Sequence, residues 1–172
     1  IGVQYLIAKS QEIFGENLFA AYLPTTIASI VMLIITYKLH EELIGKKFAI
    51  VSPLILSTTF LWFDYSHLAS QDLIYSCLVT IGIFSIVKTN SKKEIFYIFL
   101  FGIWIGLSFM MKTFLVAIPI ASLLPYFIKK KYIFASKYFW LGLIIGFTPF
   151  FLWTTSINTV SYTHLTLPTI VD

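Results

Sequence analysis

The stretch SHLASQDLIYSCLVTIGIFSIVKTNSKKE (residues 66–94) contains the pattern that decides the fold. It begins as a short polar segment, continues as an apolar run, and ends in a group of lysines. A helix that crosses a bilayer needs about 20 mostly apolar residues. We therefore predict a membrane-spanning helix over residues 72–87, with Asp72 at its start and the lysine group beyond its other end.

The same alternation of apolar runs and charged loops extends over the rest of the chain. Hydrophobic residues make up 58% of the 172 residues and charged residues 12%, which is more apolar surface than a soluble domain of this size buries. The sequence predicts an all-α, polytopic transmembrane bundle of about six spans. We place these spans at residues 18–37, 48–63, 72–87, 95–111, 113–128 and 138–155. Residues 1–16 are interrupted by charges and predict an amphipathic helix at the membrane interface.

The lysines predict how this bundle is oriented in the membrane. All 12 basic residues are lysines, and ten of them form three clusters, Lys38/Lys46/Lys47, Lys88/Lys92/Lys93 and Lys129/Lys130/Lys131/Lys137. Lysine-rich loops mark the cytoplasmic side of a polytopic protein. We therefore expect all three clusters to be cytoplasmic, with residues 64–72 and Lys112 on the extracytoplasmic side. Lysines spaced in this way mark topology and do not indicate a nucleic-acid partner.

Two pairs of glycines, Gly102/Gly106 and Gly142/Gly146, fall inside predicted spans. Glycines at this i, i+4 spacing allow two membrane helices to approach closely. Apolar helices also contain such pairs by chance, so the spacing alone leaves both interpretations open. If the pairs are functional in packing, the helices at residues 95–111 and 138–155 would be tightly packed within the chain.

Three stretches of the chain resemble motifs of one enzyme family. IFGENLFAAYLPTTIASI (residues 13–30) resembles an FGEN-x-x-A-x-R-L-P-S stretch, and residues 66–86 resemble a segment in which an aspartate precedes an apolar helix. GLSFMMKTFLVAIPIASLLPYFI (residues 106–128) is similar to the element G-L-x-x-L-T-K-G-P. In this order and spacing they resemble the polyprenol-phosphate-sugar glycosyltransferases of family 39, which include protein O-mannosyltransferases and aminoarabinose-transferase-like enzymes.

The resemblance implies a fold of the GT-C type and an integral-membrane glycosyltransferase. Its expected donor is a sugar on a polyprenyl phosphate carrier, and its acceptor a protein, a lipid or a glycan. Transfer is expected at the extracytoplasmic face of the bacterial inner membrane, with membrane lipids as the surroundings and no nucleic acid as partner. The resemblance leaves the sugar and the acceptor open.

The resemblance also implies that this chain holds only part of such an enzyme. The family's catalytic carboxylate lies in a loop that would come upstream of residue 1, so residues 1–159 are expected to be a partial domain that is inactive alone. VSYTHLTLPTIVD (residues 160–172) resembles a translated sequencing adaptor, and we expect it to be an artefactual tail. Tyr22 stands where the family motif has arginine, and Thr113 and Phe114 replace its Gly-Pro.

Two residues are the main candidates for the donor site. Lys112 corresponds to the lysine of the third motif, and the resemblance implies that it binds the lipid phosphate. Its alternative interpretation is a lysine at a helix end that extends to the headgroups. Asp72 corresponds to the family aspartate and could orient a site cation or the carrier phosphate. Alternatively, it caps the helix that it begins.

His67 and Asp64 are weaker candidates, because a solvated loop explains them better than a binding site does. Together with Asp72 they could form a metal site, and a divalent metal is one candidate for the cation that the reaction requires. The class of the protein also has rivals. A transporter or lipid flippase would place polar residues near the membrane midplane and contain internal repeats, and a membrane scaffold would carry no catalytic residues.

Overall fold

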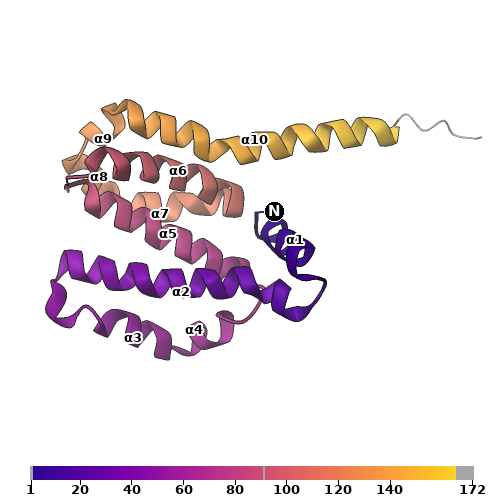
Figure 1. Ribbon diagram of the computed structural model, residues 1–172. Helices are drawn as coiled ribbons and strands as arrows, with labels where there is room; N and C mark the ends of the chain where they lie inside the picture. The colour runs from indigo at the N-terminus through magenta and orange to yellow at the C-terminus, as the bar shows by residue number, and fades with distance from the viewer. Residues whose placement is uncertain (1, 91, 166–172) are drawn as a thin grey trace, which may run out of the picture.

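The computed structural model describes residues 2–90 and 92–165, and these residues form helices and turns without a strand. Four long helices lie side by side, as Figure 1 shows: α2 (Leu18–Leu43), α5 (Gln71–Val87), α6 (Glu94–Lys112) and α10 (Lys137–Leu165). Helix α1 (Gly2–Phe14) packs against α2 and α6 at one end of this bundle. The prediction of an all-α fold is confirmed.

Short helices connect the long ones. Between α2 and α5 lie a 3-10 turn, η1 (Lys46–Phe48), and the helices α3 (Val51–Thr58) and α4 (Phe60–Tyr65). Between α6 and α10 lie η3 (Thr113–Val116), α7 (Ala117–Ser122), α8 (Leu124–Lys129) and α9 (Tyr132–Ala135), and η2 (Lys88–Asn90) comes directly after α5. Asn17 caps α2, because its Oδ1 accepts a hydrogen bond of 2.8 Å from the amide of Ala20.

The prediction of about six membrane spans is not confirmed. Within the described residues, three helical stretches are long and apolar enough to cross a membrane, Leu18–Leu43, Glu94–Ser122 and Lys137–Thr155, and α5 is apolar but shorter. The stretch at residues 48–63 is divided because Thr59 has an extended backbone, which ends α3. The Thr59 hydroxyl accepts a hydrogen bond from the backbone amide of Trp62 and so caps the start of α4. The stretch at residues 113–128 is divided into η3, α7 and α8.

The chain nevertheless runs back and forth between two ends of the bundle (Figure 1). At one end, the lysine-rich end, the three lysine clusters meet. There Lys88 forms an ion pair with Glu42, and Lys130 Nζ donates a hydrogen bond of 2.7 Å to Thr89 Oγ1. The opposite end holds the start of α2, the segment between α4 and α5, and the end of α6. Which end faces the cytoplasm stays a prediction from the lysine pattern.

Helices α6 and α10 form the most extensive contact in the bundle, and they touch through their backbones. A Cβ added to Gly142 would lie 2.2 Å from the carbonyl oxygen of Phe99, and one added to Gly106 would lie 2.3 Å from the carbonyl carbon of Gly146. Any side chain at these positions would therefore push the two helices apart. This confirms that the glycine pairs serve close helix packing.

An aromatic core lies next to this contact and holds the middle of the bundle together. The rings of Phe101 and Trp104 are stacked with centroids 5.3 Å apart, and Phe101 also lies 5.7 Å from Phe127 of α8. Phe101 is fully buried, and Trp104 is 2% exposed. The segment after α6 therefore returns along α6 toward the lysine-rich end, which leaves Lys112 at the opposite end.

Candidate functional site

An ion pair connects two helix ends at the end of the bundle opposite the lysine clusters. Lys112 is the last residue of α6, and its Nζ contacts Oδ1 of Asp72, in the first turn of α5. The Lys112 side chain is 22% exposed, whereas the Asp72 side chain is 61% exposed. The structure thus brings together the two residues that the sequence singled out as the main candidates, although they are 40 positions apart.

Asp72 is not the N-cap of α5, but it lies in the first turn of the helix, where a carboxylate interacts favourably with the helix macrodipole. The N-cap is Ser70, whose Oγ accepts a hydrogen bond of 3.2 Å from the amide of Asp72. Serine and aspartate are both favourable N-cap residues, and two such residues lie two positions apart here. Because the Ser70 hydroxyl already accepts a hydrogen bond from the first turn of α5, the carboxylate of Asp72 is available to Lys112.

Two further contacts hold the ends of α5 and α6 together. The side-chain amide of Gln71 donates a hydrogen bond to the backbone carbonyl of Met111, the residue before Lys112. The Met111 side chain in turn packs on α1, because a Cβ added to Gly2 would lie 2.7 Å from its sulfur. Sequence reasoning missed Gln71, since no local pattern indicates a contact between residues 40 positions apart.

The residue after Lys112 has a backbone conformation that favours glycine. Thr113 has φ 47° and ψ −106°, and it is the only non-glycine residue with positive φ in the part of the chain that the structure describes. The family element that residues 106–128 resemble has glycine at this position. A threonine held in a sparsely populated backbone region costs about 1–3 kcal/mol. The chain reverses here, so this strained residue helps to place Lys112 at the turn.

Tyr75 completes the surroundings of the lysine. The Nζ of Lys112 lies 5.9 Å from the centroid of the Tyr75 ring, within the range of a cation–π contact. The Tyr75 hydroxyl is buried and has no hydrogen-bond partner among the described residues. Sequence reasoning assigned Tyr75 no role. A usable signal was present, because residues at i and i+3 such as Asp72 and Tyr75 share a helix face.

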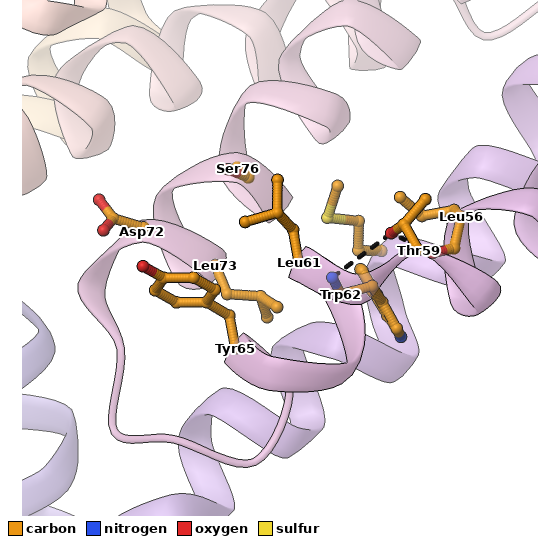
Figure 2. Close-up of a pocket in the computed structure, with 9 residues that line it drawn as sticks. Leu56, Thr59, Leu61, Trp62, Tyr65, Asp72, Leu73 and Ser76 are labelled. Carbon is orange, nitrogen blue, oxygen red and sulfur yellow. Dashed lines mark hydrogen bonds between the residues drawn. The ribbon is translucent and has the colours of Figure 1, made fainter.

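An open, mostly apolar pocket of about 420 Å³ lies beside the ion pair, between α2, α3, α4 and α5. Its lining residues are Met32, Leu56, Thr59, Leu61, Trp62, Tyr65, Asp72, Leu73 and Ser76. Figure 2 shows the Asp72 carboxylate and the Tyr65 hydroxyl at the same edge of the pocket, with Leu61 and Leu73 between them and Trp62. Asp72 is the only charged residue in this lining, so the pocket joins an apolar interior to one ionic edge.

The weaker candidates lie outside this arrangement. Asp64 belongs to α4 and is exposed, and the exposed ring of His67 contacts Phe63 with centroids 5.6 Å apart. Among the residues that the structure describes, no three histidine, cysteine, aspartate or glutamate side chains gather as a metal ion would require. The structure therefore does not bring Asp64 and His67 to Asp72 as a metal-binding group.

The chain matches the model of a protein family. The model of the family described as dolichyl-phosphate-mannose-protein mannosyltransferase matches residues 1–154. The matched range contains all three motif stretches, the ion pair and the pocket. No curated protein and no solved structure matches the chain.

Proposed function

The chain belongs to the dolichyl-phosphate-mannose-protein mannosyltransferase family, and on this premise we propose that the end of the bundle with Asp72 and Lys112 binds the phosphate of a polyprenyl-phosphate sugar donor. The family places the chain among membrane glycosyltransferases of the mannosyltransferase type. We propose further that the sugar passes to an acceptor at the extracytoplasmic face. The observation that carries the site is the ion pair between Asp72 and Lys112.

Lys112 would stabilise the group that leaves in the reaction. When the acceptor oxygen attacks the sugar, the bond between the anomeric carbon and the phosphate oxygen breaks, and the acceptor loses a proton to a general base. The carrier changes from a phosphodiester to a phosphomonoester, which gains negative charge. A fixed ammonium group at that oxygen stabilises the charge as it develops. A lysine at a helix end is also close enough to the interface to meet a lipid phosphate.

Asp72 and Tyr75 would hold this ammonium group in place. Asp72 is the more exposed partner of the pair, so an incoming phosphate can approach Lys112 without displacing a buried acid. The ring of Tyr75 makes a second contact with the Nζ of Lys112. The adjacent pocket has an apolar lining, which suits the first isoprene units of a lipid carrier.

The general base is proposed to come from outside this chain, as the resemblance implies, and a divalent metal could assist it. Asp72 is already paired with Lys112, and no second carboxylate lines the pocket in the described part of the chain. We therefore expect that residues 1–159 alone transfer no sugar. A radiolabelled polyprenyl-phosphate mannose assay on the purified chain tests this, and measurable transfer would contradict it.

The phosphate-binding role is tested by Lys112→Met in a complete enzyme of which this chain is a part. Loss of a charge-assisted contact to a leaving group costs about 10²–10³ in rate, and we expect a drop of that size. Lys112→Arg should keep part of the activity, because it retains the positive charge. Lys47→Met at the lysine-rich end is the matched control and should leave turnover unchanged. Wild-type turnover in Lys112→Met would remove this lysine from the site.

A further inference from the structure

A crevice at the lysine-rich end belongs to none of the chemistry proposed above. It lies where α6 and α10 begin and has a volume of about 770 Å³. Lys92, Lys93 and Glu94 line it together with apolar residues that include Phe96, Phe99 and Leu141. The ion pair of the candidate site lies at the opposite end of α6, so the two features are independent.

The charges around the crevice favour an anion. Two lysines and one glutamate line it. Lys92 and Lys93 are both exposed, so a ligand from the surrounding medium can contact their side chains. One carboxylate against two ammonium groups leaves a positive surplus in this lining.

The depth of the crevice in the membrane identifies the kind of anion. Both helical stretches that flank it, Glu94–Ser122 and Lys137–Thr155, are apolar enough to span a membrane, and both begin at the crevice. The boundary between water and hydrocarbon therefore crosses it. Phe96 is 55% exposed and Leu141 is 50% exposed, so the crevice also offers apolar surface next to its lysines.

We propose that this crevice binds an anionic phospholipid. The headgroup phosphate lies between Lys92 and Lys93, and one acyl chain lies along Phe96, Phe99 and Leu141. Basic pockets between membrane helices bind anionic headgroups in this manner. A free anion would use the lysines alone, whereas a phospholipid uses both the lysines and the apolar wall, and the crevice contains both.

Native mass spectrometry of the purified chain in detergent tests the proposal, with phosphatidylglycerol and phosphatidylcholine added at equal concentration. We expect phosphatidylglycerol to be retained preferentially. A lysine near an anionic headgroup strengthens binding about fivefold, so the double variant Lys92→Gln/Lys93→Gln should weaken this retention about 25-fold. The matched control Lys46→Gln/Lys47→Gln removes the same charge at the same end of the bundle, outside the crevice, and should retain the lipid.

The variant Leu141→Trp distinguishes lipid binding in the crevice from lipid binding to surface charge in general. It changes no charge but fills the apolar wall, so we expect it to reduce retention of phosphatidylglycerol as well. Far-UV circular dichroism verifies that each variant stays helical. Equal losses in the two lysine pairs, equal retention of phosphatidylcholine, or full retention in Leu141→Trp would each overturn the proposal.

Discussion

The two ends of the bundle use charge in opposite ways. The lysine-rich end holds ten of the 12 lysines, and its links between loops include the pair of Lys88 with Glu42 and the hydrogen bond from Lys130 to Thr89. At the other end, α5 and α6 are joined by the ion pair between Lys112 and a single carboxylate. At the lysine-rich end several contacts link the loops, whereas at the other end a single ion pair joins the two helices.

Under the proposed function, the lysines at the first end would set the orientation of the bundle, and the ion pair at the other end would take part in the chemistry. An exposed ion pair contributes about 0–1 kcal/mol to stability, so removing one lysine among ten changes little at the lysine-rich end. Lys112 is mostly buried, and leaving it without its partner near the membrane carries a larger cost. Substitutions at matched positions of the two ends should therefore have unequal effects.

The largest effect is expected at the glycine contact between α6 and α10, because both ends of the bundle depend on it. Gly142→Leu should lower the free energy of unfolding by about 3 kcal/mol, because its side chain would meet the backbone of Phe99 and the helices have to separate. Unfolding in sodium dodecyl sulfate, followed by circular dichroism, measures this change. Ile144→Leu, on an exposed face of the same helix, is the control and should change stability by less than about 0.5 kcal/mol. Equal stability in both variants would contradict the close contact.

An intermediate effect is expected from neutralising one carboxylate at each end. Asp72→Asn keeps the shape of the side chain but removes its charge, and Ser70 still caps α5. We expect transfer activity of a complete enzyme to fall by about tenfold, which corresponds to about 1.4 kcal/mol. Glu42→Gln, which removes the charge paired with Lys88, should leave the activity within about twofold of wild type. If the two variants lost activity equally, the two ends would not differ in function.

The smallest effect concerns the backbone. Each end has a turn with positive φ: Gly45 has φ 118° at the lysine-rich end, and Thr113 has φ 47° at the other. Thr113→Gly should raise the free energy of unfolding by about 1 kcal/mol by removing strain, whereas Gly45→Thr should lower it by a similar amount. The same denaturation assay compares them. A loss of stability in Thr113→Gly would show that the threonine side chain makes contacts that outweigh the strain.

Composition and charge were enough to predict the helical class and the grouping of the loops. Lysines stay at the surface of a membrane bundle, so their clusters predicted which loops meet at one end. Gly102 and Gly142 could also be predicted to favour close packing, because their spacing is local. The helical break at Thr59 could not be predicted, since backbone conformation there depends on the elements packed around the turn. The break after residue 111 was predicted from Lys112, but the positive φ of Thr113 was not.

The candidate site was predictable only in part. Asp72 and Lys112 stood out because charged residues are rare between apolar stretches. Their direct contact depends on how α5 lies against α6, which no local pattern specifies. Ser70 and Asp72 are equally suitable caps in sequence, and only the start of the helix at Gln71 distinguishes them. The buried hydroxyl of Tyr75 became meaningful only when Lys112 was found beside its ring.

The glycine contact between α6 and α10 has a consequence for how the chain is made. A ribosome synthesises about 5–20 residues per second, so several seconds at the slower rate separate the appearance of Lys112 from that of Gly146. In that interval α5 and α6 can already meet, but the glycine face of α6 has no helix against it. During synthesis the ion pair between α5 and α6 can therefore form before the close contact between α6 and α10.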